Sequence, residues 1–267
     1  MIKTTKVSDQ VYMLEGRGGN IGVSAGEDGI FIIDDQFAPL TEKILAAIGK
    51  ISSKELKYLV NTHWHGDHTG GNENMAEAGA TILAHENVRK RLSETPNRQG
   101  DLAPKTALPI ITFNDKLNIY MNGEQVAIFH VDNAHTDGDA ILYFINSNVL
   151  HTGDTYFEGR YPYIDLKAGG TVNGYIKAVK RSLMVINDDT KIIPGHGKVS
   201  NKKQYQSFLN MMETLKVDVL GEIKKGKTED DVAANTALTK TFDDLGYSWH
   251  FITSEKIRRT YYRSLKE

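Results

Sequence analysis

The residues best suited to chemistry lie in one short run, His63-Trp64-His65-Gly66-Asp67-His68. Alternate residues of an extended segment point the same way, so His63 and His65 can hold one metal ion together. Asp67 and His68 follow the turn at Gly66 and can reach a second ion. Binuclear hydrolytic sites hold their metals roughly 3.5–4 Å apart, a spacing that one shared loop can supply. The run therefore predicts a metal site.

Three later segments carry further ligand types. His135, Asp154 and His196 each follow a predicted strand, and each lies close to glycine in the sequence. Glycine lets the backbone approach a ligand closely, and loops at strand ends present side chains into clefts. A single histidine of this kind would be read as a surface or capping residue. Five of the nine histidines and two acids in four such segments favour metal binding instead.

Composition limits the metal and the partners. The 267 residues contain no cysteine, so any ion is held by imidazole and carboxylate, which suits zinc, iron, manganese or nickel. The net charge is −2, with no block of like charge, which argues against nucleic acid and anionic membranes and favours a small-molecule substrate. The oligomeric state stays open. The sequence shows no signal peptide and no membrane span. We expect a cytoplasmic protein, or a periplasmic one if a signal was removed.

Short strands and helices alternate along the chain. Turn residues separate the predicted strands, and apolar residues at helical spacing mark the helices. Strands are predicted at 11–14, 19–23, 30–33, 56–60, 81–84, 117–121, 125–131, 140–145, 149–151 and 191–193, and helices at 40–50, 72–78, 86–92 and 172–186. Residues 93–110 and 155–171 read as long loops, a length that is usually functional.

This order favours an α/β layered fold with two sheets face to face and helices outside. No flexible linker interrupts the sequence, so we expect one domain over residues 1–267. The metal motifs lie within residues 60–200, and residues 201–267 are expected to be mainly helical. Met211, Met212 and Leu215 recur at helical spacing and are read as helix core.

The run at 63–68 matches the His-x-His-x-Asp-His motif of the metallo-β-lactamase superfamily, and the later segments resemble its remaining motifs in order. The resemblance covers roughly Val7 to Ser200 and implies an αββα sandwich of two mixed sheets. It also implies two Zn²⁺ ions, with iron or manganese as alternatives. The implied ligands are His63, His65 and His135 for the first metal, Asp67, His68 and His196 for the second, and Asp154 as a bridge.

Asp154 is the most informative residue for the type of reaction. Many true β-lactam hydrolases have cysteine or serine there, whereas a bridging aspartate resembles the glyoxalase II, lactonase and phosphodiesterase branches. The glutathione-binding segment of glyoxalase II is not matched at Gly197–Ser200, and Phe157 replaces a tyrosine typical of lactonases. The resemblance therefore implies a general hydrolase of an ester, thioester, lactone or lactam.

The expected mechanism uses a metal-bridging hydroxide that attacks the carbonyl, because bound zinc lowers the pKa of water. Asp67 is the expected catalytic residue, orienting the nucleophile and moving its proton. Asp132, Asp137 and Asp139 are available to hydrogen-bond the ligand histidines. Aromatic residues and one arginine near the motifs are expected to contact substrate: Phe37, Trp64, Tyr156, Phe157, Arg160, Tyr161 and Tyr163.

Three other functions stay open at this point. A mononuclear iron site on His63, His65 and His135 would suit an oxidoreductase that resembles the persulfide dioxygenases of the same superfamily. A β-lactamase with modest activity is the second alternative. The third is a metal-binding protein without catalysis, which the complete set of ligand residues disfavours.

Overall fold

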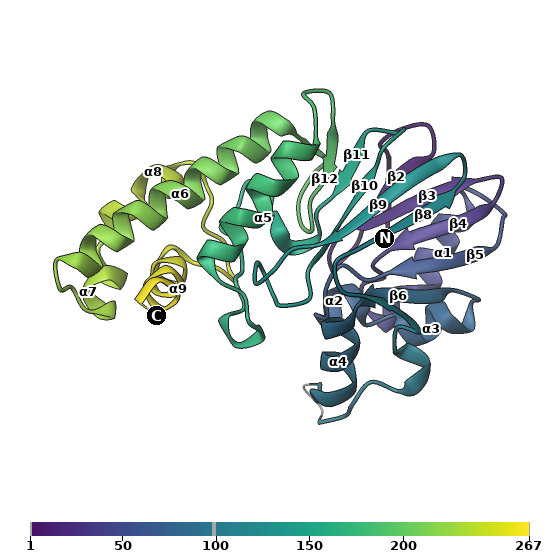
Figure 1. The fold of residues 1–267 in the computed structure, drawn as a ribbon, viewed down its shortest axis with the longest axis horizontal. Coiled ribbons are helices and arrows are strands. Elements are labelled where there is room, and N and C mark those ends of the chain that lie inside the picture. The colour runs from purple at the N-terminus through teal and green to yellow at the C-terminus, as the bar shows by residue number, and fades with distance from the viewer. Residues whose placement is uncertain (1, 98–99, 267) are drawn as a thin grey trace.

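A computed structural model describes residues 2–97 and 100–266, in which the strands form two sheets (Figure 1). The first sheet has seven strands in sequence order. Its first four strands pair antiparallel and its last four pair parallel, so the sheet is mixed. The strands are β1 (Lys3–Lys6), β2 (Val11–Glu15), β3 (Ile21–Gly26), β4 (Gly29–Ile33), β5 (Leu56–Val60), β6 (Thr81–His85) and β7 (Ile111–Phe113).

The second sheet has six strands in the order β13-β12-β11-β10-β9-β8. Only β11 and β12 pair parallel, so this sheet is mixed as well. Its strands are β8 (Lys116–Met121), β9 (Glu124–His130), β10 (Ala140–Phe144), β11 (Val149–His151), β12 (Lys191–Ile193) and β13 (Ser200–Asn201).

The two sheets bury one apolar face against each other. Phe31 and Ile33 from β4 share a buried cluster with Leu142 and Phe144 from β10. A fully buried side chain of this size contributes about 1.5–3 kcal/mol, so alternate positions of both sheets drive the packing. Helices cover the outer faces in Figure 1, as the predicted αββα sandwich requires. The α-helices of the described residues are α1 (Thr41–Gly49), α2 (Gly66–Thr69), α3 (Asn72–Glu77), α4 (Glu86–Glu94), α5 (Val172–Val185), α6 (Lys202–Lys224), α7 (Glu229–Ala234), α8 (Lys240–Asp244) and α9 (Ser254–Lys266).

The C-terminal helices lie beside α5 on the side of the second sheet (Figure 1). Met211, Met212 and Leu215 of α6 are buried in the cluster that also holds Ile192 of β12 and Tyr261 of α9. The helix-core reading of these methionines is thus confirmed. The shared cluster supports a single domain over 1–267, which stays a prediction.

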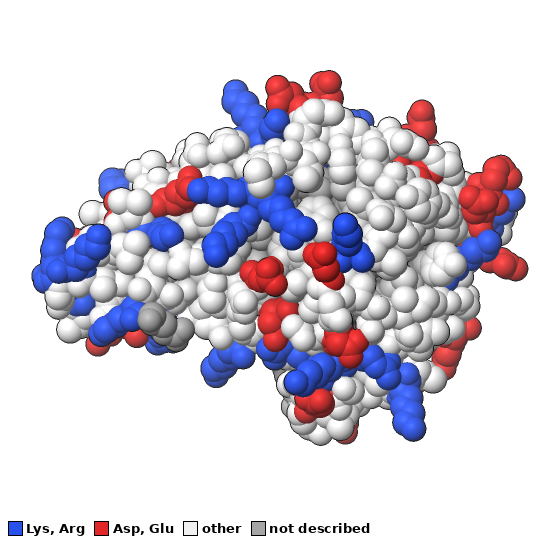
Figure 2. Space-filling model, viewed as in Figure 1, with Lys and Arg blue, Asp and Glu red and all other residues white. Residues whose placement is uncertain are grey.

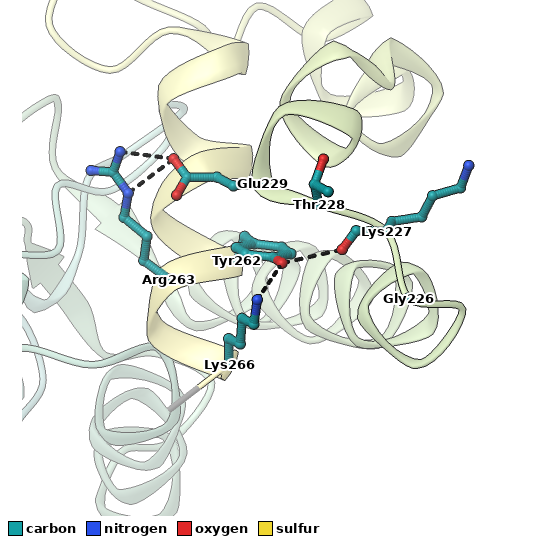
Figure 3. Close-up of a pocket in the computed structure, with 7 residues that line it drawn as sticks. All are labelled: Gly226, Lys227, Thr228, Glu229, Tyr262, Arg263 and Lys266. Carbon is teal, nitrogen blue, oxygen red and sulfur yellow. Dashed lines mark hydrogen bonds and ion pairs between the residues drawn. The ribbon is translucent and has the colours of Figure 1, made fainter.

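Polar contacts fasten α9 to the turn between α6 and α7. In the hollow of Figure 3, the Tyr262 hydroxyl donates to the Lys227 carbonyl (3.1 Å) and accepts from Lys266 Nζ (3.0 Å). Beside it, Arg263 pairs with Glu229 at 2.7 Å. This hollow contains none of the predicted metal ligands, and its charged side chains act as anchors for α9.

Three strands escaped sequence reading, each for a physical reason. β1 is the polar run Lys3–Lys6 at a sheet edge, where lysines and exposed positions are usual. β7 and β13 have three and two residues, too few to show alternation. The predicted loop 93–110 contains a short 3₁₀ turn at Lys105–Ala107, and its residues 98–99 lie outside the described residues.

Two surface features bear on partners. Acidic and basic side chains are intermixed on the face drawn in Figure 2. Within residues 2–97 and 100–266, none of the helices has the length and apolar character needed to cross a bilayer.

Candidate metal centre

Strand ends deliver every predicted ligand to one edge of the two sheets. His63 follows β5, and the chain then turns through His65 into the short helix α2, which carries Asp67 and His68. His135 lies in the loop between β9 and β10. Asp154 sits in a 3₁₀ turn just after β11, and His196 follows β12. The prediction that these residues follow strands is confirmed.

The seven side chains, called the metal cluster below, form two groups. Within each group, the ligand atoms all lie within 4.8 Å of one another. The members of the first group are His63, His65, His135 and Asp154, and those of the second are Asp67, His68 and His196.

Asp154 faces both groups. Its Oδ2 lies 3.6 Å from His135 Nε2 and 3.9 Å from His63 Nε2. Its Oδ1 lies 3.1 Å from His68 Nε2 and 3.4 Å from His196 Nε2. A single carboxylate therefore directs one oxygen to each group, which is the arrangement a bridging ligand needs.

Asp34 orients two ligands of the cluster. Its Oδ2 accepts the His68 Nδ1–H at 2.7 Å, which leaves His68 Nε2 to face the site. The same oxygen accepts the Thr62 hydroxyl at 2.7 Å, and Thr62 Oγ1 lies 3.0 Å from His63 Nδ1. A hydrogen bond at one ring nitrogen fixes the tautomer and frees the other as a ligand atom. Asp34, which sequence reasoning left without a role, thus positions a histidine in each group.

The loop after Asp154 orients the other two histidines of the first group. Asp165 Oδ2 lies 3.0 Å from His65 Nε2, and the Tyr163 carbonyl accepts the His135 Nδ1–H at 2.8 Å. The remaining nitrogens, His65 Nδ1 and His135 Nε2, then face each other at 2.9 Å. Two lone pairs at this distance repel unless a cation lies between them, so the donor set fits a metal ion.

Orphaned polar atoms support the same conclusion. His63 Nε2, His68 Nε2 and Asp154 Oδ1 are buried without a hydrogen-bond partner among the residues that the structure describes. Buried polar atoms usually have partners, and atoms that converge without one indicate a missing ion or water.

The electrostatics of the cluster favour a cation. Burial raises the pKa of Asp67, but the nearby His68 and His196 lower it more, to about 2. Burial lowers the pKa of His63 well below its usual value and that of His135 to about 4. Both imidazoles are therefore neutral at pH 7 and can each offer a lone pair to a metal ion. Burial also lowers the pKa of His196, and Asp154 reverses this effect and raises it to about 9. Ionised carboxylates thus draw positive charge into the site.

At two positions, the close approach of a ligand side chain leaves room only for glycine. A Cβ at Gly195 would lie 2.1 Å from Asp154 Oδ1, and one at Gly19 would lie 2.0 Å from His68 Cε1. Real Cβ atoms essentially never approach other atoms so closely. The glycine beside His196 was identified from sequence, whereas Gly19, distant in sequence, was not.

The three acids expected to hydrogen-bond the ligand histidines differ in their contacts. Asp139 accepts the backbone N–H of His135 at 2.6 Å and so shapes its loop. Asp137 instead pairs with Arg91 at 2.6 Å, and Asp132 is exposed beside His130. The ring nitrogens are served by Asp34 and Asp165 instead. An acidic residue directly after strand β4 was the available signal for Asp34.

The structure places two of the expected substrate contacts in the core. Tyr156 is buried against Tyr205 and Phe208, with its hydroxyl 2.9 Å from Ser200 Oγ. Tyr161 is also buried, and its hydroxyl donates to Asp243 at 2.7 Å. Both belong to the core under the C-terminal helices and do not line the site.

The other five residues lie at the surface or against the metal cluster. Phe157 stacks on His196 with ring centroids 5.0 Å apart, and Tyr163 stacks on His65 at 5.7 Å. Phe37 is exposed, and its backbone bridges to Gly70 next to α2. Trp64 is half-buried under the Arg91 guanidinium, 5.5 Å from its ring.

Arg160 is exposed and lies over Trp249, 5.3 Å from the ring centroid. Sequence reasoning missed Trp249 and its neighbour Phe251, because no spacing ties residues near 250 to ligands near 65. Their contacts appear only when the C-terminal helices fold back.

The family model of the metallo-β-lactamase superfamily matches residues 12–220. The chain therefore belongs to this superfamily, as the motifs predicted.

Curated relatives include two kinds of hydrolase. A hydroxyacylglutathione hydrolase of Pelagibacter ubique is 32% identical over 145 residues, which cover 53% of this chain and 52% of the relative. A metallo-β-lactamase type 2 of Bacillus sp. (strain 170) is 23% identical, with 69% of each chain covered. The 2,4-dinitroanisole O-demethylase subunit alpha of Nocardioides sp. is 23% identical, over 78% of this chain and 61% of its own length. The chain thus spans only about half to three-fifths of some curated relatives.

Solved structures confirm the fold. A metallo-β-lactamase from Pontibacter korlensis aligns with a TM-score of 0.69 at 18% identity, over 80% of this chain and 99% of that one. The sec-alkylsulfatase Pisa1 from Pseudomonas sp. gives a TM-score of 0.74 at 17% identity. That alignment covers 98% of this chain and 50% of the sulfatase. At these identities the likeness concerns the fold alone.

Proposed function

We propose that the protein is a hydrolase with two metal ions, zinc above all, that cleaves an ester, thioester, lactone or lactam. The observation that carries the proposal is Asp154, whose two oxygens face the two ligand groups at 3.1–3.9 Å. The curated relatives named as hydrolases support the reaction class.

Two divalent ions in such a site act as Lewis acids and lower the pKa of water toward neutrality. The chain's own residues complete the chemistry. Asp67 is ionised at neutral pH, and its Oδ2 lies 3.3 Å from His196 Nε2. Its side chain is 29% exposed, against 5% for Asp154, so Asp67 can reach a water molecule and orient it by accepting its hydrogen bond. Phe157 and Tyr163 pack on the rings of His196 and His65 and place apolar surface beside the site.

The complete second group favours hydrolysis over the mononuclear iron alternative. Asp67, His68 and His196 converge as closely as the first group does. A persulfide dioxygenase-like enzyme would need only His63, His65 and His135. Modest β-lactamase activity remains a variant of the same hydrolytic chemistry.

Metal analysis and a substrate panel test the proposal. The panel contains a chromogenic cephalosporin, a lactone, a glutathione thioester and a phosphodiester. We expect about two zinc ions per chain and turnover of at least one carbonyl substrate. His63→Ala and Asp67→Ala should abolish that turnover, whereas Asp132→Asn, an exposed acid outside the cluster, should not. A single iron with oxygen consumption on a persulfide, or full activity without metal, would refute the proposal.

A further inference from the structure

The segment Tyr247–Lys256, called the C-terminal rim below, follows α8 and includes the first turn of α9. It lies beyond the part of the chain that the family model matches. It nevertheless contacts the surroundings of the second ligand group. The Trp249 ring lies 6.1 Å from Phe157, which stacks on His196. Trp249 Nε1 donates to the Tyr161 carbonyl at 3.0 Å, which fixes the indole in place.

The same segment reaches the first ligand group through a second aromatic pair. The Phe251 ring lies 5.2 Å from Tyr163, whose ring packs 5.7 Å from His65 and 5.5 Å from His135. Trp249 and Phe251 are 5.6 Å apart, and Phe251 is 43% exposed. A continuous aromatic wall thus leads from both groups to the solvent.

Two cationic side chains lie against the rings of this aromatic wall. Arg160 lies 5.3 Å from the Trp249 centroid, and Lys256 Nζ lies 4.1 Å from that of Phe251 and 5.7 Å from that of Tyr163. Lys256 also donates to the Phe251 carbonyl at 2.9 Å. Neither cation forms an ion pair with any carboxylate in the described part of the chain, so their charges are available to a ligand.

We propose that the C-terminal rim forms a substrate subsite for a flat apolar group that carries a carboxylate or another anion at its outer end. Trp249 and Phe251 bind the flat group, since aromatic faces favour stacked or edge-to-face partners. Arg160 and Lys256 bind the anion. The subsite deepens the proposed function by naming a substrate class for the same metal centre.

Calorimetric titration of the metal-replete protein tests the subsite without turnover. Phenylacetate and its uncharged analogue phenylacetamide serve as probes. Phenylacetate should bind, and Trp249→Ala and Phe251→Ala should each weaken it by about two- to tenfold. Trp249→Phe keeps a ring and should retain most of the affinity. Lys256→Met should weaken phenylacetate about two- to fivefold and leave phenylacetamide unchanged.

Matched controls are Tyr120→Ala, a 74% exposed aromatic on β8, and Lys50→Met, next to α1. A carboxylate bound only to the ions would be insensitive to Lys256→Met, which would overturn the anion site. The proposed role of the aromatic wall would be overturned if phenylacetate did not bind. It would also be overturned if Trp249→Ala and Phe251→Ala changed its affinity no more than the control substitutions do. A protein that binds phenylacetate but hydrolyses nothing would keep the subsite and refute the proposed function.

Discussion

The metal cluster and the C-terminal rim flank the same site but are built by opposite means. Cluster residues lie at buried strand ends, and hydrogen bonds that their imidazole rings donate to Asp34, Asp165 and the Tyr163 carbonyl fix the rings. In the rim, Trp249 is half-buried and Phe251 is exposed, and their rings contact Phe157 and Tyr163. If the proposed functions hold, the ligand atoms lie on the rigid part of the molecule and the contacts that select a substrate lie on its surface.

The largest effect should come from Asp154→Asn, which removes the charge that both ligand groups share. The amide keeps the shape of the side chain but presents an N–H₂ to one group. We expect loss of at least one metal ion and a fall in kcat/KM of more than about a hundredfold, beyond that of outer-partner mutations. Metal analysis and kinetics on the same samples check this. Unchanged metal content would mean that Asp154 does not bridge.

A graded loss is expected from the two outer acids. Asp34 is fully buried and bonds to both His68 and Thr62, so Asp34→Asn should lower metal affinity or activity about a hundredfold. The Asp165 side chain bonds to the ring of His65 and is 12% exposed, so Asp165→Asn should cost about tenfold. Competition with a metal chelator measures both affinities. The reverse order would contradict the roles assigned here.

The fold and the metal cluster could be predicted because their signals are local. His63, His65, Asp67 and His68 are adjacent in sequence, and each later ligand follows a strand that its apolar residues reveal. The rim could not be predicted, because the contact of Trp249 with Phe157 joins residues about ninety positions apart. Nothing in the residues around 250 indicates which surface they cover.

A stability measurement can test whether the metal cluster and the C-terminal helices are independent of each other. Arg258 of α9 is buried and donates to the Ala233 carbonyl at 2.9 and 2.7 Å, and also to Thr239. Arg258→Met leaves these acceptors without a donor and should lower the free energy of unfolding by about 2–3 kcal/mol. Chemical denaturation measures the loss, and metal analysis of the folded variant should still give the wild-type content. Loss of metal would show that the cluster depends on the C-terminal helices.

The smallest effect is expected from Tyr156→Phe. This substitution distinguishes residues of the loop after Asp154 that belong to the core from those expected to contact substrate. Tyr156 follows Asp154 closely in sequence, but its ring points into the core and its hydroxyl meets Ser200. Removing that hydroxyl should cost about 1 kcal/mol of stability. It should leave KM and kcat unchanged, because no part of the side chain reaches the metal cluster. Tyr163→Ala is the comparison, since its ring packs on His65 and its loss should raise KM. A change in KM for Tyr156→Phe as large as for Tyr163→Ala would place Tyr156 back at the substrate.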